Sequence, residues 1–174
     1  GGAQGAFFHI FNHGIMKGLA FLSAGALLYA LKLSLGSHDP LVIADLAGAA
    51  RRYPLPALAL SVAVLGLGGL PPLAGFMSKW QIFAAGFLTK DTLVICLVIF
   101  AALNSVLSLA YYVPLVNTMY RNQPGKAVID GGKIPTAMLI PLGVLAGLVL
   151  LFGFWPGLMD WLVQPASQSL LAGL

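Results

Sequence analysis

Residues 9–25 read HIFNHGIMKGLAFLSAG, and this stretch decides the fold of the chain. Most of it is apolar enough for the interior of a bilayer, yet His9, His13 and Lys17 recur in it at a spacing of four residues. In an α-helix this spacing places the three side chains on one face, each about one turn beyond the last. A lysine at the centre of a membrane helix costs roughly 2.5 to 3.5 kcal/mol. We therefore expect this face to line protein or a water-filled path rather than lipid.

The composition of the whole chain is that of an integral membrane protein. Of its 174 residues, 59% are hydrophobic and 8% are charged, whereas a soluble domain carries about 25% charged residues. The net charge of +4 comes from basic residues scattered through the loops without a dense patch, which gives no indication of nucleic-acid binding. The single cysteine, Cys96, excludes an intrachain disulfide and a cysteine-ligated cluster built by this chain alone.

An all-α bundle of about four membrane helices is predicted, as the C-terminal portion of one transmembrane domain. Apolar stretches of membrane length support this prediction, and the mildly amphipathic tail after them is expected at the membrane interface. The chain does not begin with Met and its first residues already read as helix, so we expect a piece of a longer protein that lacks its N-terminal portion. The predicted helices cover residues 6–31, 55–88, 92–120 and 134–154, and the tail covers 157–174.

The apolar stretch 55–88 is predicted to be one crossing made of two half-helices. It is longer than the about 20 residues that cross a ~30 Å core, and GLGGLPPLAG interrupts it. Glycines followed by two prolines end one helix and start the next, which frees backbone groups at membrane depth. Transporters use broken helices of this kind at ion sites, and Lys79 lies about two turns into the second half. The residues of the predicted break are Gly69, Leu70, Pro71, Pro72 and Gly75.

Each of these features also has a structural alternative. The prolines are then a simple packing kink, Lys79 snorkels to the interface, and the histidines form interhelical hydrogen bonds. Lys17 would pair with an acid from outside this sequence, because no acid of the chain is expected at its depth. The third helix carries a polar face that either makes interhelical hydrogen bonds or lines a water path. This face comprises Asn104, Ser105, Ser108 and Tyr111.

No cofactor or metal site is predicted from the sequence. The chain has no P-loop and no dinucleotide fingerprint. His9 and His13 share the i, i+4 spacing of a zinc site, but the Glu of that motif is missing between them. An autonomous enzyme is therefore not expected.

The distribution of Lys and Arg predicts the orientation in the membrane. Loops 32–53 and 121–133 hold three basic residues each, whereas the connection between the second and third helices holds only Lys90. The positive-inside rule places the two basic loops in the cytoplasm, with the chain in the cell (inner) membrane. Stretch 55–88 must then be a single crossing, because a hairpin would put the two loops on opposite faces.

Two motifs carry a resemblance to a known family. The segment FHIFNHGIMKGLAFLSAG resembles the H-x-x-x-H-x-x-x-K-x-x-x-F-L-x-x-G helix of the proton-conducting antiporter family, and GLPPLAGFMSKW resembles its broken-helix signature G-[IL]-P-P-x-x-G-F-x-x-K. Members include the antiporter-like membrane subunits (L, M and N types) of respiratory complex I, the A-type and D-type subunits of Mrp-type antiporters, and membrane subunits of hydrogenases. The resemblance covers essentially the whole chain and implies the C-terminal part of an inverted-repeat fold.

The resemblance implies a proton half-channel. In it, Lys17 is the central relay lysine, His9 and His13 are its neighbours, and Lys79 gates exit to the outside. The expected function is a proton-translocating membrane subunit of a complex I-like NADH:quinone oxidoreductase, with no redox centre of its own. Its expected partners are other membrane subunits, the lipid bilayer, and protons, with Na⁺ as the alternative ion.

Two other functions remain open at this point. One is a subunit of a Mrp-type Na⁺/H⁺ antiporter, and the other is a non-conducting membrane anchor of a hydrogenase complex. N-type subunits generally lack the His/His/Lys helix, so the resemblance favours L-type, Mrp D-type or hydrogenase-type members. The long lateral helix of L-type subunits is not seen after Pro156.

Overall fold

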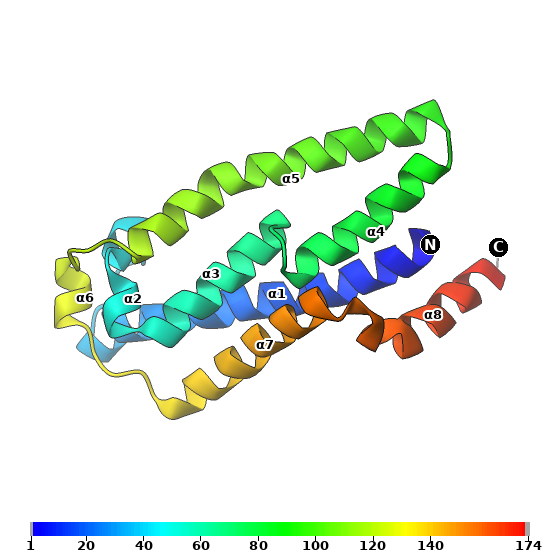
Figure 1. The fold of residues 1–174 in the computed structure, drawn as a ribbon. Helices are drawn as coiled ribbons and strands as arrows, with labels where there is room; N and C mark the ends of the chain where they lie inside the picture. Colours follow the sequence, from blue (N-terminus) through cyan, green and yellow to red (C-terminus); the bar gives the residue numbers. More distant parts are fainter. Residues whose placement is uncertain (1, 173–174) are drawn as a thin grey trace.

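The computed structural model describes residues 2–172, and every regular element in that range is a helix (Figure 1). Within these residues, three helices are long and apolar enough to cross a membrane: α1 (Gly2–Leu31), α5 (Thr92–Met119) and α7 (Thr136–Phe154). The predicted all-α membrane bundle is thereby confirmed. The remaining elements are the half-helices α3 (Pro54–Gly68) and α4 (Ala74–Leu88), the short helices α2 (Ala49–Arg52), α6 (Lys126–Asp130) and α8 (Asp160–Ala172), and the 3₁₀ turns Leu33–Leu35, Ile43–Leu46 and Pro156–Met159.

Helix α1 is the centre of the bundle and packs against α3, α4, α7 and α8. Its 30 residues contain no proline, and its buried residues recur every three or four positions, so the helix turns one face to its neighbours. Phe8, Met16, Leu19 and Leu27 are at most 2% exposed. The helix is already formed at Gly2, the first described residue, four residues before the predicted start at residue 6.

The stretch 55–88 crosses the bundle once, in two pieces. Helices α3 and α4 run one after the other in the same direction, and α5 returns alongside both of them (Figure 1). Helix α3 ends at Gly68 and is capped by Gly69, whose φ of 84° is a left-handed conformation that glycine adopts without steric cost. Its last carbonyls are satisfied as in a Schellman cap, with Leu70 N donating to Leu65 O at 3.0 Å. The predicted break at this position is confirmed.

Glycines allow three backbone segments to meet at the break. A Cβ on Gly75 would overlap the carbonyl of Gly66, whose carbon lies only 2.8 Å from the Cβ position. A Cβ on Gly153 of α7 would overlap the Pro72 carbonyl oxygen in the same way. The end of α3, the start of α4 and the end of α7 therefore touch at backbone distance, which is the approach that glycine permits.

The two basic loops, 32–53 and 121–133, lie at the same end of the bundle (Figure 1). A backbone hydrogen bond of 2.9 Å from Gly125 N to Ala47 O joins them. This arrangement agrees with a single crossing by α3 and α4, because a hairpin would have separated the loops.

The C-terminal tail packs more closely than an interfacial segment needs to. Met159 and Val163 belong to the same buried cluster as Phe8 of α1. Trp161, in contrast, is 74% exposed on the outer side of α8. The tail thus packs onto one side of the bundle, and Trp161 faces away from it.

Arg52 and Tyr53 hold the second basic loop against the start of α3. Arg52 donates to the carbonyl oxygens of Ile129 and Gly131, and the Tyr53 hydroxyl donates to Gly132 O at 2.8 Å. Burial raises the pKa of the Tyr53 phenol above its ordinary value. The hydroxyl therefore stays protonated at neutral pH and keeps donating.

Replacing Tyr53 with phenylalanine is expected to destabilise the protein by about 1 kcal/mol, because Gly132 O loses a donor while the ring still fits. The melting temperature of the detergent-purified protein measures this effect. Tyr120→Phe is the matched control, since Tyr120 is 49% exposed and its hydroxyl has no bonding partner in the described part of the chain. Equal melting temperatures for the two variants would contradict the assigned role of the Tyr53 hydroxyl.

Candidate functional site at the helix break

Lys79 connects the two half-helices to α5. From α4, its Nζ donates to Leu67 O of α3 at 2.7 Å and to the Ser105 hydroxyl of α5 at 3.1 Å. The Leu67 carbonyl needs such a donor, because the residue four positions later is Pro71, which has no N–H. The lysine stem crosses Gly69, where the Lys79 Cδ lies 3.2 Å from the position that a Cβ would take. The break and its lysine thus form one unit.

A small cavity lies on the α5 side of this unit. It has a volume of about 190 Å³, and Lys79 and Ser105 contribute polar groups to a lining that is otherwise mostly apolar. One water molecule takes up about 30 Å³ in the liquid. The cavity therefore has room for water beside the Lys79 ammonium.

The predicted polar face of the third helix divides into two parts. Ser105 contacts Lys79, and Ser108 lies beside it, donating to Ser105 O at 2.6 Å. Asn104 is exposed, and Tyr111 is 60% exposed with its ring against Tyr112. Only the two serines of this face belong to the site in the described structure.

His9 reaches the break through a serine. Its Nδ1 lies 2.9 Å from the Ser78 hydroxyl, which also bonds to Gly75 O at 3.2 Å. A hydroxyl carries a single hydrogen. Ser78 therefore either donates it to Gly75 O and accepts a hydrogen bond from His9 Nδ1–H, or donates it to His9 Nδ1. The His9 and His13 rings follow one another at 5.7 Å between centroids. The protonation of His9 is thereby linked to the first turn of α4.

Lys17 lies farther along α1 and does not reach the break. Its side chain and that of His13 are exposed, and Lys17 has no hydrogen-bond or ion-pair partner within residues 2–172. The row of three polar residues on α1 therefore begins at the break with His9 and continues onto a surface that no described helix covers.

Two polar residues of the site were missed in the sequence. Ser78 is fully buried beside His9, and Asn12 is 1% exposed and donates to Ala74 O at 3.4 Å. The Asn12 Oδ1 has no partner among the described atoms. Their positions in the sequence could have identified them, since Asn12 lies on the same helix as the histidines and Ser78 directly precedes Lys79. Among the described residues, no cluster of three or more His, Cys, Asp or Glu side chains could hold a metal ion.

Comparison with protein families matches residues 1–107 to the transmembrane family described as NADH:quinone oxidoreductase/Mrp antiporter. The F(420)H(2) dehydrogenase subunit N of Methanosarcina mazei is 35% identical over 169 residues, which cover 96% of this chain and 34% of that protein. The A-type subunit of the Na(+)/H(+) antiporter of Alkalihalophilus pseudofirmus is 28% identical over 176 residues, covering 95% of this chain and 21% of that protein. N-type members were expected to be less similar, and the Methanosarcina relative does not support that expectation.

Solved structures show the same arrangement. A chain of respiratory complex I from Thermus thermophilus with bound aureothin matches with a TM-score of 0.69 and 30% identity, over 90% of this chain and 33% of that one. A chain of the Mrp complex from Dietzia sp. DQ12-45-1b matches with a TM-score of 0.78 over 95% of this chain and 37% of that one, and at 19% identity it shares the fold. The chain spans about a third of the length of the Methanosarcina relative and of the complex I chain that it matches.

Proposed function

This chain belongs to the NADH:quinone oxidoreductase/Mrp antiporter transmembrane family, and from that premise we propose that it relays protons through the membrane part of a multi-subunit complex. In the proposal, Lys17 is the central relay group, His13 and His9 follow it, and Lys79 is the exit gate. The observation that carries the proposal is the position of Lys79, whose Nζ bonds to Leu67 O and Ser105 beside a cavity.

The chemistry of an amine suits Lys79 to this role. An ammonium has three donors, of which two are used by Leu67 O and Ser105. The third proton can leave through water in the adjoining cavity, and the neutral amine still has two N–H groups for the same two acceptors. Loading and release of a proton therefore do not require the break to open.

The histidine row supports delivery of protons to this point. An imidazole can take a proton at one nitrogen and release one from the other. His9 and His13 stand one turn apart on α1, and His9 continues into the Ser78 hydroxyl at the break. A positive charge arriving on this row repels the Lys79 ammonium and favours release of its proton.

The proposal also covers the type of complex that contains the chain and the reaction that drives proton transport. We place the chain in a redox-driven, complex I-like assembly, with loops 32–53 and 121–133 on the cytoplasmic side of the cell membrane. The identity to the Methanosarcina dehydrogenase protein and to the complex I chain supports this choice. The matches to the Alkalihalophilus antiporter protein and to a Mrp complex chain support a second candidate, a component of a Na⁺/H⁺ antiporter.

Sodium dependence separates these two candidates. The complete complex is reconstituted in liposomes, and internal acidification is followed with a pH-sensitive dye. The redox-driven pump is expected to acidify the liposomes in sodium-free buffer when an electron donor and a quinone are supplied. Acidification that needs a sodium gradient and no electron donor would favour the antiporter.

Replacing Lys17 with methionine is expected to lower the rate of proton uptake in the same assay, by less than the roughly 10²-fold that a positioned acid–base group contributes. The expected loss is smaller than for Lys79, which is hydrogen-bonded at the break. Lys17 is exposed, so water can carry protons past the position of the missing ammonium. Lys126→Met is the control, since Lys126 is an exposed lysine of loop 121–133. If the Lys17 variant and a double variant that also neutralises Lys79 both pump at the wild-type rate, the chain is a non-conducting anchor.

A further inference from the structure

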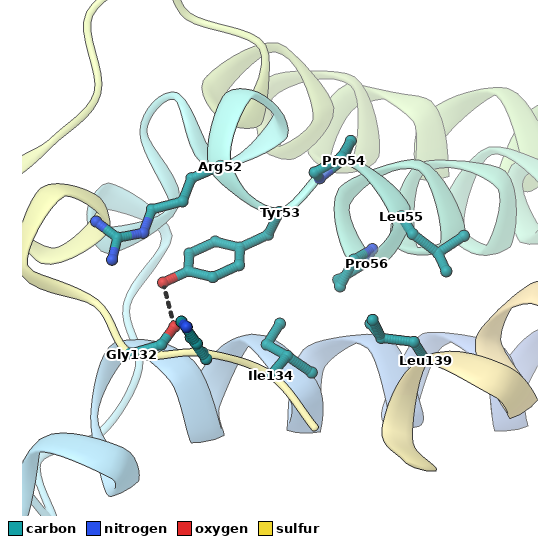
Figure 2. A pocket seen from close by; sticks show the side chains of 9 residues that line it. Arg52, Tyr53, Pro54, Leu55, Pro56, Gly132, Ile134 and Leu139 are labelled. Carbon is teal, nitrogen blue, oxygen red and sulfur yellow. Dashed lines mark hydrogen bonds between the residues drawn. The ribbon is translucent and has the colours of Figure 1, made fainter. Parts of the chain in front are cut away.

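A pocket unrelated to the helix break opens at the end of the bundle that carries the basic loops. It has a volume of about 450 Å³ and lies between the start of α3 and the segment that leads into α7. Figure 2 shows the polar residues Arg52 and Tyr53 on one side and the apolar Leu55, Ile134 and Leu139 on the other. The pocket therefore grades from polar to apolar in the direction of the membrane-spanning helices.

Two basic residues, Arg52 and Lys133, are among those that line the pocket, and no acidic residue is. Arg52 uses two of its nitrogens on the carbonyls of Ile129 and Gly131. A guanidinium has five N–H donors, so donors remain for a further acceptor. Lys133 is exposed, and its ammonium has no hydrogen-bond or ion-pair partner among residues 2–172. Two of the residues that line the pocket therefore carry a positive charge, and no acidic residue of the lining neutralises them.

We propose that this pocket binds the headgroup of an acidic phospholipid. The phosphate would lie at Arg52 and Lys133, and the acyl chains would follow Leu55 and Leu139 along the outside of α3 and α7. A guanidinium matches the geometry of phosphate oxygens, and basic pockets between membrane helices on one leaflet are suited to anionic headgroups. A soluble phosphorylated ligand would leave the apolar half of the pocket unfilled.

The site is independent of the proposed proton relay, because none of its residues contacts Lys79 or the histidines. It joins the two basic loops to the start of α3 through Arg52 and Tyr53. A bound acidic lipid would add an acceptor to the donors already gathered there. The bound lipid would therefore stabilise this end of the bundle.

The experiment is a lipid titration of the complete, delipidated protein in detergent, with bound lipid read by native mass spectrometry. Dioleoylphosphatidylglycerol is expected to bind more tightly than dioleoylphosphatidylcholine. Lys133→Gln is expected to weaken the phosphatidylglycerol affinity about fivefold, as the loss of one basic residue near a membrane surface predicts. Arg52 is kept, because its two carbonyl bonds hold the loop.

Lys126→Gln is the matched control, an exposed lysine at the same end of the bundle that does not line the pocket. Equal phosphatidylglycerol affinity for wild type and Lys133→Gln would overturn the proposal, and so would an equal loss in the Lys126 variant. Inorganic phosphate is added as the third arm. Displacement of the lipid by millimolar phosphate would identify a free-anion site and likewise overturn a lipid assignment.

Discussion

Replacing Lys79 with glutamine is expected to lower proton translocation by the complete complex by roughly 10²-fold, the scale of losing a positioned acid–base group. The glutamine amide has two N–H donors and can still serve Leu67 O and Ser105. It cannot take up or release a proton near neutral pH. The variant therefore keeps two N–H donors at the break, on a slightly shorter side chain, and removes the positive charge and the titration.

The measurement is dye-monitored proton uptake into liposomes at matched protein content. Lys90→Gln is the control, because Lys90 is an exposed lysine in the turn between α4 and α5. Lys79→Ala is a second variant, expected to lose transport and also stability, since it leaves Leu67 O without its donor at a cost of about 1 to 3 kcal/mol. A Lys79 variant that pumps at the wild-type rate would refute the gate assignment.

Replacing Gly75 with alanine is expected to be among the most destabilising single changes in the chain. The added methyl would overlap the Gly66 carbonyl and lie 3.1 Å from the Met16 Cε. The overlap is with backbone, so α3 and α4 must separate at the break rather than repack a side chain. Overpacking of this kind costs about 1 to 3 kcal/mol when side chains can yield, and we expect at least the upper end here.

The melting temperature of the detergent-purified protein tests this expectation. Gly147→Ala is the matched control, because a Cβ at Gly147 meets no atom of the described structure within 4 Å. Alanine there gains about 1 kcal/mol of helix propensity, so the two substitutions should shift the melting temperature in opposite directions. A Gly75→Ala protein as stable as wild type would show that the half-helices do not touch as described.

Most of the fold could be predicted because its determinants are local. Helix length and hydropathy are properties of continuous segments, and they indicated the crossings now seen as α1, α5 and α7. The break was predictable for the same reason. A left-handed glycine at residue 69 and a proline at residue 71 act on their own backbone, whatever packs around them.

The candidate site was only partly predictable. Lys79 stood out as a charge within an apolar helix, and the i, i+4 spacing put His9 and His13 on one face. Ser78 carried no comparable signal, and Asn104 was grouped with Ser105 although only Ser105 contacts the lysine. The spacing of residues specifies a face of a helix, but not the neighbour that the face meets.

By itself, the sequence determined that this chain is a membrane bundle with one interrupted crossing and an ionisable row on its central helix. The tertiary structure decided which of these groups meet: His9 with Ser78, Lys79 with Ser105, and Gly153 with the backbone of the break. The same holds for the pocket between Arg52 and Leu139, whose walls come from segments far apart in the chain. The physical reason is that contacts between helices depend on the rotation of each helix about its axis and on its offset along it. Both quantities follow from packing of the whole bundle, whereas hydropathy, spacing and backbone conformation are properties of each segment alone.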